Sequence, residues 1–171
     1  MKTLFFFLLF MVNGLPWAVC LSEDGKALLL FKRNLTPDSQ TLLGSWNASE
    51  QSPCAWTGIS CDRFQRVKAV DLPSLGLEGT IHSNISSLVS LRRLDLSSNV
   101  FTGNIPLSLG NLRNLQELKL DTNALSGTIP AELGNLTQLT SLSLFSNNLN
   151  GSIPSQLANC RNLSGNHLGN N

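Results

Sequence analysis

The sequence LVSLRRLDLSSNVFTGNIPLSLGN at residues 88–111 decides the fold, because the chain repeats its pattern twice more. The second copy, LRNLQELKLDTNALSGTIPAELGN, spans residues 112–135, and the third, LTQLTSLSLFSNNLNGSIPSQLAN, spans residues 136–159. Leucine, asparagine, glycine and proline recur at the same places in all three copies. A fixed period of this length predicts a solenoid in which each copy forms one coil and stacks on its neighbours.

The leucines of each copy predict a short strand followed by a turn. In the segment L-x-L, Leu94 and Leu96 should point into the core while Asp95 points outward, because side chains alternate along a strand. Stacked coils would pair these strands into a parallel sheet over a continuous leucine core. Asn99 and its counterparts follow the strand, where an amide side chain can satisfy backbone groups on the inside of the turn.

The pattern L-x-x-L-x-L-x-x-N-x-L resembles the plant-type leucine-rich repeat of receptor kinases and related secreted proteins. The resemblance implies an α/β fold. We therefore expect a right-handed leucine-rich repeat solenoid with a parallel β-sheet on the concave face and a helical, disulfide-bonded N-terminal cap. Residues 62–87 keep part of the pattern and are expected to form a degenerate first coil before the three repeats at 88–159.

Residues 1–20 have the composition of a secretory signal peptide. Lys2 is followed by an apolar segment from Leu4 to Val12, and Ala18-Val19-Cys20 offers small residues for cleavage. A membrane anchor is the alternative, but this apolar segment is far shorter than the ~20 residues that span a bilayer. We therefore predict a secreted protein of the apoplast, or a plasma-membrane protein if the chain is a fragment of a receptor kinase.

Residues 21–61 are expected to cap the first coil, which a solenoid would otherwise leave uncovered. Ser22 can cap a helix, and Ala27, Leu28, Phe31 and Leu35 recur on one helical face. With the sequence CAWTGISC at 54–61, this segment resembles the N-terminal domain of plant-type leucine-rich repeat proteins.

The cysteines predict one structural disulfide. Cys54 and Cys61 flank a tight loop in an oxidising compartment and should pair. A metal site or a redox pair fits poorly, because no histidine or third cysteine lies near and the spacing is not C-x-x-C. Cys160 occupies a leucine position of the repeat. It is either a buried thiol in place of leucine or one of the two cysteines of an intermolecular disulfide.

The repeat pattern fails after residue 159. Residues 160–171 are expected to form a broken repeat or a disordered tail, since Asn166 occupies a leucine position and the composition is that of a loop. Two interpretations follow. The chain is a fragment or truncated product of a longer receptor, or it is a genuine short secreted protein.

The sequence contains no motif for catalysis, for a cofactor or for a metal. It lacks H-E-x-x-H, G-x-S-x-G, P-loop and Rossmann patterns, so we predict no enzyme activity. Loss of Lys2 with the signal peptide leaves 11 lysines and arginines against 11 acidic residues. This balance argues against nucleic acid or an anionic membrane as partner. Asp71 and Asp95 should lie on adjacent strands. They could form a carboxylate pair or a cation site, but we favour a mixed-charge binding surface that contains both.

The outward positions of the strands are the candidate ligand-binding residues. They comprise Arg92, Arg93, Asp95, Glu117, Lys119, Asp121 and Phe145. Candidate glycosylation sites occur where Asn precedes x-Ser/Thr, at Asn34, Asn47, Asn84, Asn135, Asn150 and Asn162.

The resemblance implies a secreted or extracellular recognition module that binds a peptide or protein ligand, or a partner receptor ectodomain, through its concave sheet. Two alternatives stay open: a short secreted inhibitor of a cell-wall-degrading enzyme, and the outer fragment of a membrane receptor serine/threonine kinase.

Overall fold

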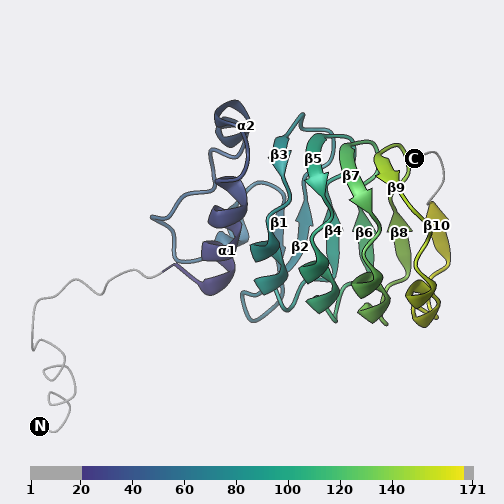
Figure 1. The fold of residues 1–171 in the computed structure, drawn as a ribbon. Coiled ribbons are helices and arrows are strands. Elements are labelled where there is room, and N and C mark those ends of the chain that lie inside the picture. Colours follow the sequence, from purple (N-terminus) through teal and green to yellow (C-terminus); the bar gives the residue numbers. More distant parts are fainter. Residues whose placement is uncertain (1–20, 168–171) are drawn as a thin grey trace, which may run out of the picture.

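A computed structural model describes residues 21–167, which form a row of coils stacked behind a helical cap (Figure 1). The predicted signal peptide at 1–20 and the end of the predicted broken repeat or tail at 168–171 lie outside the described residues. Figure 1 shows the cap at one end of the row and each later coil beside the one before it.

The cap contains two helices. Helix α1 (Glu23–Lys32) begins where the sequence predicts, since Ser22 Oγ accepts a hydrogen bond from the Gly25 N–H at 3.2 Å. Its buried face includes Ala27, Leu28 and Phe31. Helix α2 (Pro37–Leu42) is a turn and a half that the sequence did not reveal; Pro37 begins it, as proline often does at the first position of a helix.

An aromatic cluster joins the cap to the coils. The ring of Phe31 lies 6.2 Å from Trp46 and 6.0 Å from Phe101 of the first full repeat, and Trp46 stacks on Trp56 at 5.7 Å. Both indole N–H groups have partners: Trp46 Nε1 donates to the Thr57 carbonyl and Trp56 Nε1 donates to Glu50 Oε2. The cluster is therefore buried without orphaned polar groups.

Cys54 and Cys61 form the predicted disulfide, and Cys160 is a buried thiol whose Sγ donates to the Leu133 carbonyl. Burial raises the pKa of the Cys160 thiol, which lowers its reactivity.

We expect peptide mapping under non-reducing conditions to recover the 54–61 disulfide and an unmodified Cys160. Replacing Cys54 and Cys61 with serine should lower the free energy of unfolding by about 2.5 kcal/mol, because the unfolded chain regains the conformational freedom that the disulfide removes; the loss is modest because the closed loop is short. A dimer linked through Cys160 as the main species would contradict the prediction that Cys160 is an unmodified, buried thiol.

The large sheet runs the length of the molecule. Its strands in spatial order are β1 (Ile59–Cys61), β2 (Val67–Asp71), β4 (Arg93–Asp95), β6 (Glu117–Lys119), β8 (Ser141–Ser143) and β10 (Gly165–His167). Strand β1 is antiparallel to β2, and all other pairs are parallel. Asp71 pairs with Asp95 and Asp95 pairs with Lys119, so the register is one repeat per strand, as the sequence predicts.

A second, smaller parallel sheet was not predicted. It consists of β3 (Glu78–Thr80), β5 (Val100–Asn104), β7 (Ala124–Thr128) and β9 (Asn148–Asn150). Short 3-10 helices return the chain to the large sheet: η2 (Ser83–Ser87), η3 (Leu107–Asn111), η4 (Ala131–Asn135) and η5 (Ser155–Asn159), with η1 (Pro53–Ala55) in the cap.

Two glycines let the 3-10 helices stack closely. A Cβ atom on Gly110 would lie 2.8 Å from the carbonyl carbon of Glu132, and one on Gly134 would lie 2.6 Å from that of Gln156. Both distances are shorter than side chains tolerate, so glycine at this position of the repeat sets how near successive coils approach.

The asparagines of the repeat close their turns, as predicted, and they also form a ladder of hydrogen bonds between coils, which was not predicted. Asn99 Nδ2 donates to the carbonyls of Leu72, Leu96 and Ser97, and its Oδ1 accepts from the Leu75 and Leu77 N–H groups. Asn123 and Asn147 donate in the same way to their own coil and to the coil before. Each asparagine thus closes its turn and ties two coils together.

The cap is fastened to the first coil through backbone groups. Leu35 forms an antiparallel bridge with Gly79, and the Thr80 N–H donates to the Asn34 carbonyl. At the other side of the cap, buried Asp24 accepts a 2.8 Å hydrogen bond from the Val67 N–H at the start of β2. Asp24 therefore stabilises the junction as well as the start of its own helix.

One position in each of four successive coils has a left-handed backbone without glycine. Ser74, Ser98, Thr122 and Ser146 all have φ between 53° and 56°. Threonine is costly there because its branched Cβ crowds the backbone.

We expect Thr122→Asn to raise the free energy of unfolding by about 1 kcal/mol, because asparagine tolerates this conformation. Thr128→Asn, at an exposed strand position, should give no gain in denaturant unfolding; equal gains at both sites would contradict the explanation.

Candidate ligand-binding face

The outward side of the large sheet is the concave face, and backbone hydrogen bonds fix its side chains in rows. At the start of each strand, a backbone N–H donates to the carbonyl of the equivalent residue in the coil before, over 2.7 to 3.0 Å. These bonds run from Arg92 to Lys68, from Gln116 to Arg92, from Thr140 to Gln116 and from Ser164 to Thr140. Corresponding residues of successive coils therefore lie side by side, one strand spacing apart.

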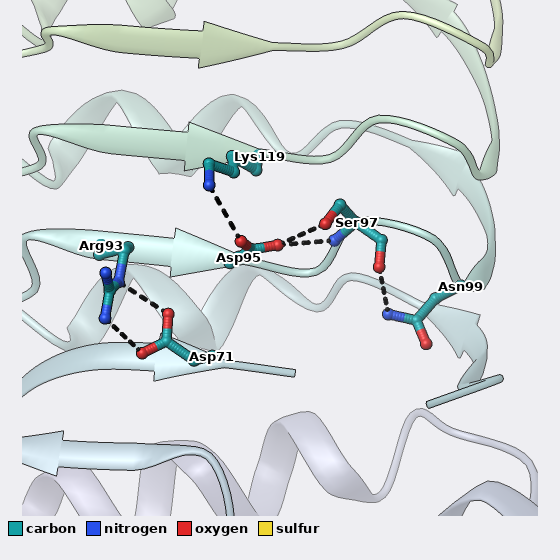
Figure 2. A network of polar contacts seen from close by, with 6 residues as sticks. All are labelled: Asp71, Arg93, Asp95, Ser97, Asn99 and Lys119. Atoms are coloured by element: carbon teal, nitrogen blue, oxygen red, sulfur yellow. Dashed lines mark hydrogen bonds and ion pairs between the residues drawn. The ribbon is translucent and has the colours of Figure 1, made fainter. Parts of the chain in front are cut away.

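Arg93 is already engaged within the face. Its Nε and Nη2 each lie 2.8 Å from an oxygen of Asp71 on the neighbouring strand, which is the two-pronged pairing that guanidinium makes with carboxylate (Figure 2). This hydrogen bonding and the charge of Asp71 raise the pKa of Arg93. A ligand carboxylate would have to compete with Asp71, so Arg93 is less available than the sequence suggests.

Asp95 lies on the face but is largely covered, with 9% of its surface exposed. Its Oδ1 accepts hydrogen bonds from the Ser97 N–H and from Ser97 Oγ, and its Oδ2 lies 3.4 Å from Lys119 Nζ (Figure 2). Ser97 was not among the candidate residues. The sequence could have indicated the contact between Asp95 and Ser97, because an acidic side chain at a turn often accepts a hydrogen bond from the residue two positions later.

The other predicted residues differ in exposure. Arg92 is exposed, and among residues 21–167 its guanidinium has no hydrogen-bond or ion-pair partner. Glu117, Asp121 and Phe145 are half-buried on the same face. Arg92 is therefore the guanidinium of the face that is most available to a ligand.

Asp71 and Asp95 do not form a carboxylate pair that faces solvent, since Arg93 and Lys119 bind them. Across residues 21–167 no cluster of three or more histidine, cysteine or acidic side chains could hold a metal ion. The arrangement is that of a mixed-charge surface.

The six predicted glycosylation sites lie away from the strands of the large sheet. Asn135, Asn150 and Asn162 are exposed, whereas Asn34, Asn47 and Asn84 are half-buried. Asn34 Nδ2 donates to the Leu30 carbonyl and Asn47 Oδ1 accepts from Ser49, so local contacts hold both side chains. Attachment of carbohydrate stays a prediction.

Comparison with known proteins identifies the family. The family model for the leucine rich repeat N-terminal domain matches residues 21–62. The family model for the leucine rich repeat matches residues 90–112, 114–136 and 138–160. A chain of the BIR3–SERK2 complex of Arabidopsis thaliana is 37% identical with a TM-score of 0.73, over 80% of this chain and 76% of that chain. This chain belongs to the plant leucine-rich repeat proteins.

Other plant leucine-rich repeat proteins that it resembles are longer. The ectodomain of the Arabidopsis receptor kinase GASSHO1/SCHENGEN3, solved in complex with CASPARIAN STRIP INTEGRITY FACTOR 2, is 36% identical with a TM-score of 0.77, over 82% of this chain and 17% of that one. A probable inactive leucine-rich repeat receptor-like protein kinase of Arabidopsis thaliana is 38% identical over 95 residues, which are 55% of this chain and 14% of the relative. The chain thus spans a small part of its curated relative. Within residues 21–167 no helix has the length and apolar character to cross a membrane.

Proposed function

We propose that this leucine-rich repeat protein is an extracellular recognition module, without enzyme activity of its own, that binds a peptide or protein ligand or a partner receptor ectodomain through the concave face. The observation that carries the proposal is the rigid array of exposed and half-buried charged side chains on that face, held in register by the backbone. Rigid presentation of side chains favours specific binding because little conformational entropy is lost.

The similar solved chains support this function. One of them belongs to the complex of BIR3 with SERK2, and the other was solved with CASPARIAN STRIP INTEGRITY FACTOR 2. Both contain the same kind of stacked coils as this chain. Residues 21–167 share the fold of these chains, which were solved in complex with another protein or factor.

Within the face, we assign the main charge contact to Arg92. Its exposed guanidinium can pair with a carboxylate of the ligand through two hydrogen bonds. Arg93 pairs with Asp71 and Lys119 pairs with Asp95, and these two ion pairs set the charge pattern around Arg92. Phe145 adds an apolar contact at the far end of the same face.

Arg92→Glu should weaken ligand binding by about tenfold or more, because it replaces an attraction with a repulsion at a fixed position. The ligand would first be captured by screening secreted peptides and receptor ectodomains against the full secreted chain, and affinity would then be measured by calorimetry. Arg33→Glu, which reverses an exposed charge on the cap, should leave binding unchanged. Equal affinities for the parent chain and both variants would place recognition outside the concave face.

A further inference from the structure

Basic residues collect along one edge of the solenoid, where each coil turns into the large sheet. This edge is made of residues 62–68, 86–92, 110–116, 134–140 and 158–164. It carries half of the 12 lysines and arginines of the chain, and all of them are exposed: Arg63, Arg66, Lys68, Arg92, Arg113 and Arg161. In these segments Asp62 is the only acidic residue. We call this surface the basic edge.

Hydrogen bonds between coils hold the basic edge in a fixed row. Asn114 Nδ2 donates to the Val89 carbonyl at 2.9 Å, and Asn162 Nδ2 makes the equivalent contact with Thr137 at 3.4 Å. Arg113 Nη1 reaches across to the Asn135 carbonyl at 3.0 Å and keeps its charge in doing so. Arg113 and Arg161 are therefore presented on a fixed backbone, whereas the segment 134–140 carries no lysine or arginine.

The cap end of the basic edge is a tight loop that presents an aromatic ring. Asp62 Oδ1 accepts hydrogen bonds from the Phe64 and Arg66 N–H groups, and the Asp62 N–H donates to the Arg66 carbonyl. The bond from the Arg66 backbone is the main cause that lowers the pKa of Asp62. The Asp62 carboxylate is thus used within the loop and is flanked by Arg63 and Arg66.

Phe64 stands out from this loop, with 69% of its surface exposed and the Arg63 guanidinium 4.7 Å from the centre of its ring. Further along, Val89 is 54% exposed. The disulfide at Cys61 adjoins the loop and limits its motion. Exposed aromatic and arginine side chains on a rigid support are the residue types that dominate protein interfaces.

We propose that the basic edge, with Phe64 at its cap end, binds an acidic segment of a protein partner that also carries an apolar side chain. Five of the six cations are arginines, which pair with carboxylates through two hydrogen bonds. The apolar groups at Phe64 and Val89 match a polypeptide, whereas a purely charged polymer would leave them exposed. The basic edge shares Arg92 with the concave face, whereas Arg63, Phe64 and Arg66 lie before strand β2 and outside that face. The inference does not depend on the proposed function.

The probe for this surface is a fluorescent synthetic peptide of eight glutamates around one central phenylalanine. We expect the full secreted chain to bind it at low salt, with affinity falling as salt screens the charges. Arg63→Glu combined with Arg66→Glu should weaken binding by about tenfold. Phe64→Ala should weaken binding of this peptide and not of an all-glutamate peptide. Arg33→Glu, the matched control on the cap, should have no effect.

Three results would overturn the proposal. The first is failure of the chain to bind the peptide. The second is equal or stronger binding to an oligogalacturonate or to phosphatidylserine vesicles that Phe64→Ala leaves unchanged, because the partner would then be another polyanion. The third is loss of peptide binding in Lys119→Ala, which would place the peptide on the concave face. Circular dichroism and thermal unfolding of each variant show whether it is folded; all substituted residues are exposed or half-buried.

Discussion

Asn99→Ala is expected to lower the free energy of unfolding by about 4 kcal/mol, because several buried backbone groups lose their partners together. Asn99 makes five hydrogen bonds, three from its Nδ2 and two to its Oδ1. They involve two coils, and the side chain that makes them is buried. Alanine leaves a cavity too polar to be stable when dry, and the water that enters can replace only part of the bonds.

Urea unfolding of the protein would measure this loss. The matched control is Asn148→Ala, which removes an exposed asparagine of β9 and should change stability by no more than about 0.5 kcal/mol. Asn99→Asp tests the mechanism, since a carboxylate keeps the acceptor and loses the donors. A small effect of Asn99→Ala, similar to that of the control, would mean that the ladder contributes little to stability.

Gly79→Ala is expected to release the cap from the first coil and to lower the free energy of unfolding by at least about 3 kcal/mol. The backbone of Gly79 has φ of 145°, which side chains other than hydrogen rarely allow. A Cβ atom there would also lie 2.7 Å from the Leu35 Cα and against the Asn34 carbonyl oxygen. Those are the backbone atoms of the bridge that fastens the cap.

Gly76 provides the control within the same segment. It also has positive φ, at 66°, but a Cβ atom on it would meet nothing within 4 Å. Gly76→Ala should therefore cost only about 1 kcal/mol from backbone strain. Hydrogen exchange would separate the two variants, because Gly79→Ala should increase exchange in residues 21–61 far more than Gly76→Ala. Matching exchange profiles would show that the close contact at Gly79 is relieved without detaching the cap.

The strict repeat explains why much of the fold could be predicted. The leucines of L-x-L, the asparagine turn and the 54–61 disulfide depend on local spacing, and spacing is visible in the sequence. Ser22 and the apolar face of α1 could be predicted for the same reason. Each of these features needs only a pattern within one coil or one helix.

The features that were missed depend on contacts between coils. The alternation in β5, where Phe101 is buried between exposed Val100 and Thr102, is too short and too rich in glycine to indicate a strand alone. Its pairing with β3 and β7 forms the small sheet. Likewise, the sequence shows Arg93 and Asp95 as outward residues, but only the register brings Asp71 and Lys119 to them. Whether a charged side chain on the face is available to a ligand therefore depends on its neighbours on the adjacent strands.

The backward reach of the asparagine ladder has a consequence for how such chains change length. Asn123 donates to the Leu96 carbonyl and Asn147 donates to the Leu120 carbonyl, so each link reaches back 27 residues and successive links are equivalent contacts one period apart. Duplicating or deleting a whole period in the gene preserves this pattern of links, whereas adding one residue between a strand and its asparagine shifts the asparagine out of line with the coil before. Recombination between repeats can thus lengthen or shorten the molecule in whole coils, and each event adds or removes one row of recognition residues.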